Sequence, residues 1–178
     1  MLKKIIIVLA SIIGIYFLLC FIGKSDSRVE RMIEINASAE TIKNTLYDFR
    51  IFQEQWSPYT KYDPQMKTTY SGTAGERGYK LSWESDKEEA GKGSLTYQYT
   101  HADTIMNTLH FDDFGDSENY YIIKQQGEKC QVVWGMYSQT PFIFRAMGLF
   151  MNFEEMIAPD FEVGLRNLKG IIEQKNTN

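Results

Sequence analysis

The sequence predicts an α+β domain in which a curved antiparallel sheet wraps around a long C-terminal helix, with one transmembrane helix before it. Three observations predict this arrangement: an apolar run at residues 5–22, strand-like segments between residues 77 and 138, and a helical apolar stripe at residues 153–173. The stripe needs a broad apolar surface to lie on, and the strand-like segments are the other part of the chain able to supply one. The chain of 178 residues is long enough for one domain of about 150 residues and a short extra segment.

The N-terminal segment has the length and composition of a membrane span. Residues 5–22 are apolar apart from Ser11 and Gly14, and lysines flank both ends. About eighteen residues is near the lower limit for crossing the hydrocarbon core of a bilayer. A cleaved signal peptide and lipidation at Cys20 are alternatives, but the large residues Leu19 and Phe21 match neither type of cleavage site well. We expect an uncleaved single-pass anchor with the soluble domain on the extracytoplasmic side, although the flanking positive charges are nearly balanced.

We divide the chain into a membrane anchor at residues 1–23, a tether at residues 24–28 and one soluble domain at residues 29–175. The net charge is −4 and basic residues form no cluster, which argues against nucleic acid as a partner. Cys20 and Cys130 are not expected to pair, since one lies in the anchor and the other in the domain. A domain of this size does not need a disulfide to be stable.

The first elements of the domain are a strand and two short helices. Polar and apolar residues alternate over Val29–Asn36, which is typical of a strand. Ser38 is suited to cap the following helix, although the capping box is incomplete. A second short helix carries Phe49 and Trp56 on one face, and Pro58 ends it because proline disfavours a helical residue before it.

Six further strands are expected between these helices and the C-terminal part of the chain. Glycine and aspartate residues typical of turns separate them at intervals of about ten residues, which predicts an antiparallel meander. The expected strands are Met66–Tyr70, Gly78–Glu84, Lys92–Thr100, Thr104–Asp112, Tyr120–Gln126 and Lys129–Ser138.

Two helices are expected after the last strand. The first is a short apolar helix at Phe142–Phe150, and the second is the long helix at Phe153–Glu173. Pro159 removes a hydrogen-bond donor and clashes with the preceding turn, so we expect a kink or break near Ala158, with Asp160 at a new helix start. The long helix repeats apolar residues at steps of three and four, namely Phe153, Ile157, Phe161, Leu165, Leu168 and Ile172.

Several short motifs occur in the order typical of one protein superfamily. They are residues 29–40, Asp48–Phe49, Trp56–Pro58, Tyr70–Gly75, Gly91–Ser94, Val133–Met136 and Pro159–Lys169. Together they span nearly all of residues 29–173, and the chain resembles the SRPBCC superfamily of helix-grip proteins, which includes START lipid-transfer domains, birch-pollen-allergen-like proteins and polyketide cyclases. The resemblance is closest to a membrane-anchored, polyketide-cyclase-like bacterial subgroup. It implies a helix-grip fold with an apolar ligand cavity between the sheet and the terminal helix.

The sequence shows no pattern typical of a catalytic centre. His101 and His110 stand alone in or beside strands, and Cys130 has no basic neighbour that would activate it. The acidic turn lacks the Asp-x-Asp-x-Asp-Gly pattern of a calcium loop, so we expect no metal and no cofactor. That turn contains Asp112, Asp113, Asp116 and Glu118.

Aromatic residues make up 14% of the chain and there are eight methionines, which suit the wall of an irregular apolar space. Ten residues are expected to face inward and to line a ligand cavity, although each of them also fits an ordinary core. They are Trp56, Tyr79, Leu81, Trp83, Trp134, Met136, Met147, Phe150, Met151 and Phe161.

The expected function is membrane-tethered binding of a small hydrophobic or lipid-like ligand in this cavity. The first alternative is a cyclase or aromatase-like enzyme, in which Asp48 or His110 would face the cavity near Tyr97 for acid–base catalysis. The second is a protein-interaction module that uses the outer face of the sheet or an acidic loop, with a protein partner that the sequence does not identify.

Overall fold

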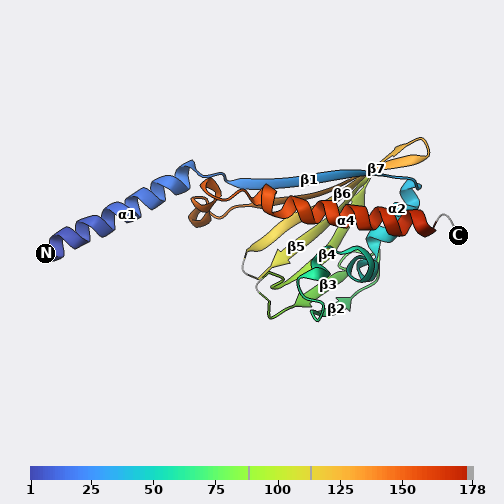
Figure 1. Cartoon of the computed structure of the whole chain (residues 1–178), viewed down its shortest axis with the longest axis horizontal. Coiled ribbons are helices and arrows are strands. Elements are labelled where there is room, and N and C mark those ends of the chain that lie inside the picture. Colours follow the sequence, from blue (N-terminus) through green and yellow to red (C-terminus); the bar gives the residue numbers. More distant parts are fainter. Residues whose placement is uncertain (88, 113, 176–178) are drawn as a thin grey trace.

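Figure 1 shows the computed structural model, which describes residues 1–87, 89–112 and 114–175. Helix α1 (Leu2–Ile22) projects from one end of the molecule, and helix α4 (Phe153–Lys175) lies along a curved antiparallel sheet. The predicted fold class, an antiparallel sheet wrapped around a long C-terminal helix, is therefore confirmed.

The sheet has seven strands in the order β1-β7-β6-β5-β4-β3-β2, and every neighbouring pair is antiparallel. Strand β1 (Asp26–Ile35) pairs with β7 (Lys129–Gln139), so the first and last strands lie side by side. The other strands form the predicted meander, and a bulge between Tyr97 and Tyr99 bends the sheet at β4. Their bounds are β2 Lys67–Ser71, β3 Lys80–Glu84, β4 Lys92–His101, β5 Thr104–Phe111 and β6 Gly115–Gln126.

Strand β1 begins three residues before the predicted start at Val29, because Asp26 already pairs with Gln139 of β7. Residues 26–28, which we expected in the tether, are therefore part of the sheet. Only residues 23–25 connect α1 to the domain, and the Ser25 carbonyl accepts a hydrogen bond from Thr140 N. The short connection holds the end of α1 close to the end of β7.

The segment between β1 and β2 contains the two expected short helices and an extra turn. Helix α2 (Ala39–Tyr47) has the predicted cap, because Ser38 Oγ accepts a hydrogen bond of 3.1 Å from Thr41 N. Helix α3 (Phe49–Ile51) continues into a π-helical turn, η1 (Phe52–Trp56), and a 3₁₀ turn follows as η2 (Tyr59–Lys61). The π-helical turn ends at Trp56, as the following proline predicts.

The predicted helix at Phe142–Phe150 is wrong. The structure has two separate 3₁₀ turns there, η3 (Phe142–Phe144) and η4 (Met147–Leu149). Nine residues are too few to form a stable helix without a surface that supports it, and this segment leaves the sheet to contact α1 instead.

Of the expected kink or break at Pro159, the break is wrong, since α4 continues as one helix through this residue. Ala158 and Phe161 are 3% and 1% exposed, so residues on both sides of the proline pack into the same core. This packing offsets the hydrogen bond that proline removes, and Asp160 lies within the helix instead of at a new helix start.

The predicted stripe of α4 forms the centre of the core from Phe161 onward. Phe161, Leu165, Leu168 and Ile172 are each at most 1% exposed. Phe153, however, is 37% exposed at the start of the helix, where the stripe extends past the sheet surface. The grip of the sheet on α4 thus begins about two turns into the helix.

Candidate functional site

A partly enclosed cavity of about 110 Å³ lies between the middle strands, the η1–η2 segment and α4. Its polar lining residues are Gln53, Tyr59, Glu89, Asn119 and Tyr121. The apolar lining residues come from six different elements and two loops, and they are Phe52, Met66, Leu81, Trp83, Ala90, Leu95, Leu109, Phe111, Trp134 and Phe161. The wall is therefore mainly apolar and is built from segments distant in sequence.

Four of the ten residues predicted for the cavity are among its lining residues, and they are Leu81, Trp83, Trp134 and Phe161. Three others are buried in the surrounding core but do not line the cavity. These are Trp56, Tyr79 and Met136, which are 1%, 3% and 8% exposed.

The remaining three predicted residues lie on the surface, so the expectation that they face inward is wrong. Met147, Phe150 and Met151 are 45%, 78% and 39% exposed. They belong to the connection between β7 and α4, whose first turn, η3, contacts α1.

Stacked aromatic rings fill much of the space beneath α4. The ring of Phe161 lies 4.2 Å from that of Trp134, with the two planes only 8° apart. The Trp56 ring packs edge-on against Trp134 at 5.5 Å, and Phe52 packs edge-on against Trp56 at 4.6 Å. Most of the aromatic content predicted to line a cavity is therefore ordinary core, and the volume left empty is small.

Two buried donors near the cavity have no acceptor among the described residues. They are the indole N–H groups of Trp56 and Trp134, whereas the indole of Trp83 donates to the Ala90 carbonyl at 3.1 Å. An unpaired buried donor costs about 1–3 kcal/mol. Trp134 is itself a lining residue of the cavity, whereas Trp56 is not.

Asn119 is a buried polar residue on the inner side of β6, and sequence reasoning missed it. It is 3% exposed, lines the cavity and accepts a hydrogen bond of 3.3 Å from Asn107 Nδ2 of the neighbouring strand. Asn119 alternates with Tyr121 and Ile123, which are both buried, so its amide lies on the same face of the strand as these two residues. That polar interruption was the signal available in the sequence.

Two tyrosines, Tyr59 and Tyr121, are among the lining residues of the cavity. Burial raises the pKa of Tyr59, and the nearby Asp160 carboxylate raises it further. Burial likewise raises the pKa of Tyr121 well above its ordinary value. A phenol is already neutral at physiological pH, and a raised pKa keeps it so at higher pH, so both hydroxyls can donate or accept hydrogen bonds.

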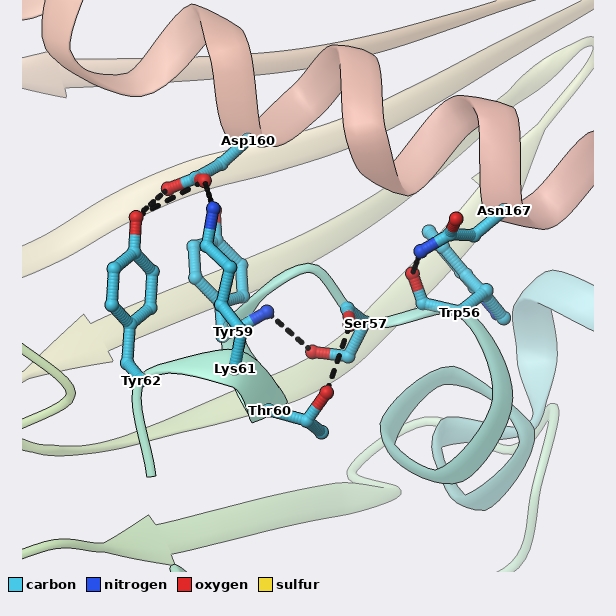
Figure 2. Close-up of polar contacts among 8 residues, drawn as sticks. All are labelled: Trp56, Ser57, Tyr59, Thr60, Lys61, Tyr62, Asp160 and Asn167. Atoms are coloured by element: carbon cyan, nitrogen blue, oxygen red, sulfur yellow. Dashed lines mark hydrogen bonds and ion pairs between the residues drawn. The ribbon is translucent and has the colours of Figure 1, made fainter. Parts of the chain in front are cut away.

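A polar cluster on α4 holds the η2 wall of the cavity in place (Figure 2). The Asp160 carboxylate is 2.7 Å from Lys61 Nζ and accepts bonds of 3.1 and 3.0 Å from the Tyr62 hydroxyl. About two turns further along α4, Asn167 Nδ2 donates to the Trp56 carbonyl at 3.4 Å. Asp160 is only 8% exposed, so this pairing fixes η2, and with it Tyr59, against the helix.

The acid–base groups suggested by the sequence do not line the cavity. Asp48 caps α3 by accepting from Arg50 N at 2.9 Å, and the Tyr97 hydroxyl donates to Thr100 at 3.1 Å. His110 lies at the surface, where its Nδ1 is 2.6 Å from an Asp116 oxygen. The predicted catalytic pairing is therefore wrong.

The acidic turn beside His110 is a surface feature in the part that the structure describes. His110 Nε2 is 3.6 Å from Asp112, while Asp113 lies outside the described residues. Within residues 1–87, 89–112 and 114–175, no three His, Cys, Asp or Glu side chains gather in a way that could hold a metal ion.

Helix α1 is long and apolar enough to cross a membrane. Cys20 near its end is fully buried, and its Sγ lies 3.7 Å from the Ile143 carbonyl of the β7–α4 connection. Cys20 and Cys130 are both free thiols.

No family model and no curated protein matches this chain. Many solved structures share its fold. One is a norcoclaurine synthase from Thalictrum flavum, which is 12% identical over 85% of this chain and 96% of its own, with a TM-score of 0.62. Another is the Zhui aromatase/cyclase from Streptomyces sp. R1128, at 15% identity, 84% and 95% coverage and a TM-score of 0.57.

A third similar structure is the Aha1 dimer from Colwellia psychrerythraea, at 16% identity, 83% and 96% coverage and a TM-score of 0.58. These proteins differ in what their names say they do, and at such identities the likeness is one of fold alone. The common architecture is the helix-grip fold, an antiparallel sheet wrapped around a long C-terminal helix.

Proposed function

We propose that this chain, which has the helix-grip fold, binds a small apolar molecule in the cavity beneath α4 while α1 anchors it to a membrane. The observation that carries the proposal is the mainly apolar cavity of about 110 Å³ that remains beside the aromatic stack. Binding in such a space is favourable because it removes apolar surface of the ligand from water, which contributes about 25 cal/mol per Å².

The size of the cavity limits the ligand to about one ring or a short acyl segment. Drug-sized ligands occupy sites of about 300–1,000 Å³, whereas an engineered apolar cavity of about 150 Å³ binds benzene. The cavity of about 110 Å³ is near the second class. A complete lipid would require η2 or α4 to move, which the Asp160–Lys61 ion pair and the Asp160–Tyr62 hydrogen bonds oppose.

The polar groups of the wall favour a ligand that carries a hydrogen-bond acceptor, such as a carbonyl oxygen. The unpaired indole N–H of Trp134 and the neutral hydroxyls of Tyr59 and Tyr121 are donors that such an atom would satisfy. This set suits binding better than acid–base chemistry. The carboxylate among the described lining residues is that of Glu89, and it is a poor candidate for acid–base chemistry inside the cavity because Glu89 is exposed.

We expect benzaldehyde to bind the full-length protein purified in detergent, and to bind more tightly than toluene, which lacks an acceptor. The readout is the set of three tryptophan indole signals in a ¹⁵N-tryptophan NMR spectrum. The Trp134 signal should shift saturably with benzaldehyde, and the Trp83 signal should shift less because its N–H group is already bonded to Ala90. A Trp134 signal that does not respond to either compound would contradict the proposal.

Two leucine variants separate binding in the cavity from partition into the detergent. Leu95 is 4% exposed and lines the cavity, so Leu95→Phe should fill it and abolish the shift. Leu149 is 41% exposed and lies outside, so Leu149→Phe should respond like the wild type. An equal response of the two variants would place the binding elsewhere.

A further inference from the structure

The connection between β7 and α4 exposes many large apolar side chains. We call residues 141–153 the apolar connection. It carries a single charged side chain, Arg145. Exposed contiguous apolar patches mark sites that contact another apolar phase or partner. Seven of its large apolar side chains are between 37% and 78% exposed, and they are Ile143, Phe144, Met147, Leu149, Phe150, Met151 and Phe153.

The apolar connection packs directly on the C-terminal end of α1. The Phe142 ring stacks on that of Phe17 at 6.1 Å and meets that of Phe21 edge-on at 5.0 Å. The Tyr16 hydroxyl and the Cys20 thiol both donate to the Ile143 carbonyl. Anchor and connection are therefore joined by ring contacts and by polar contacts.

A glycine permits this close approach. A Cβ atom at Gly23, just after α1, would lie 2.2 Å from the Arg145 carbonyl oxygen, which is a backbone atom that cannot move aside. The chain thus leaves α1 and passes against the backbone of the apolar connection. The contact involves the backbone itself and not only flexible side chains.

The length of α1 sets the depth of this contact in a bilayer. Its 21 residues span about 31 Å at 1.5 Å per residue, close to the hydrocarbon thickness of about 30 Å. Phe17 lies five residues before the last helical residue, Ile22, or about 7.5 Å along the axis. If α1 spans the hydrocarbon core, the groups packed against Phe17 and Phe21 lie inside its outer layer.

Part of the backbone of the apolar connection is paired in the way that this environment requires. Backbone polar groups need protein partners in hydrocarbon. Phe144, Arg145, Gly148, Leu149 and Phe150 each donate their N–H to the carbonyl three residues earlier. The carbonyl of Ile143, which is outside this pattern, receives the two donors from α1.

The single charge in this segment is also partnered. Arg145 Nε donates to the Thr140 carbonyl at 3.2 Å, and its guanidinium lies 5.7 Å from the centre of the Phe142 ring. Both contacts draw the group toward the β7 end of the segment, where the sheet begins. An arginine held at that edge can reach the headgroup layer.

We propose that the apolar connection is immersed in the lipid acyl-chain region beside the last two turns of α1. The exposed face therefore contacts the bilayer. Two elements, α1 and the apolar connection, hold the domain at the membrane surface. The inference rests on the proposed function in one respect, since it requires α1 to be a membrane span. What it adds is that residues 141–153 also insert into the bilayer.

The test uses tryptophan reporters in the full-length protein, reconstituted into phosphatidylcholine vesicles with and without brominated acyl chains. Phe150→Trp and Met147→Trp report on the apolar connection. Phe114→Trp is the matched surface control, because Phe114 and Phe150 are 72% and 78% exposed. Ile13→Trp, at an exposed position in the middle of α1, reports on the span itself. The signal of the wild-type tryptophans is subtracted in each case.

We expect the added emission of Phe150→Trp and Met147→Trp to be shifted to shorter wavelength and quenched by the brominated chains, as for Ile13→Trp. The emission of Phe114→Trp should stay at the wavelength of water-exposed tryptophan and be unquenched. Quenching of Ile13→Trp without quenching of either connection reporter would overturn the immersion and leave the anchor intact. Absence of quenching at Ile13→Trp would instead overturn the anchor, and the immersion with it.

Discussion

Replacing Phe161 by alanine is expected to lower the free energy of unfolding by about 3–5 kcal/mol, the usual cost of removing a buried aromatic ring. Phe161 is 1% exposed, and its ring is stacked on that of Trp134 at 4.2 Å. It also forms part of the cavity wall, so its loss would enlarge the cavity and remove packing from the centre of the helix grip. For a domain of this size the midpoint of thermal unfolding should fall by about 6–20 °C.

The measurement is thermal unfolding of the detergent-purified full chain, followed by circular dichroism. Phe153→Ala is the matched control, because Phe153 is on the same helix but is 37% exposed. It should change stability by no more than about 0.5 kcal/mol. Similar losses for the two variants would mean that α4 is not held by the sheet in the way described.

Replacing Gly164 by alanine is the second change with a large expected effect, because α4 has no room for a side chain there. A Cβ atom at Gly164 would lie 2.5 Å from Cζ3 of Trp134 and 3.2 Å from Cδ of Pro58. Trp134 is only 2% exposed, so its ring cannot move aside without disturbing the core. Overpacking of this kind costs about 1–3 kcal/mol.

Gly170→Ala, in the same helix, isolates this steric cost. A Cβ atom at Gly170 would meet no atom within 4 Å. Both substitutions gain up to about 1 kcal/mol from the higher helix propensity of alanine, so their difference in unfolding free energy measures the overpacking alone. We expect Gly170→Ala to stabilise the protein and Gly164→Ala to be less stable than Gly170→Ala by about 1–3 kcal/mol. Equal stabilities would contradict the close packing of α4 on Trp134.

The parts of the fold that the sequence predicts well depend on local periodicity. The buried stripe from Phe161 to Ile172 follows from steps of three and four along one helix. The inner face of β3 follows in the same way, since Leu81 and Trp83 alternate with polar residues and both line the cavity. The meander follows because turn residues separate the strands at regular intervals.

The parts that were missed depend on contacts between distant segments. The apolar residues of 142–151 have helical spacing, but their conformation is decided by the contact of Phe142 with α1, about 120 residues away. Asp160 looked like a helix-start residue, whereas its pairing with Lys61 and Tyr62 places it within α4 and next to the cavity wall. Tyr59 was missed for the same reason, because η2 forms part of the cavity wall only when it packs against α4.

A crystal structure of the full-length protein under xenon pressure would show directly whether the cavity is open, since xenon enters dry apolar cavities of about this size. We expect xenon density between Leu81, Leu95 and Phe161, and no such density in Leu95→Phe. A wild-type structure in which side chains close this space and exclude xenon would contradict the claim that the helix grip encloses a binding cavity.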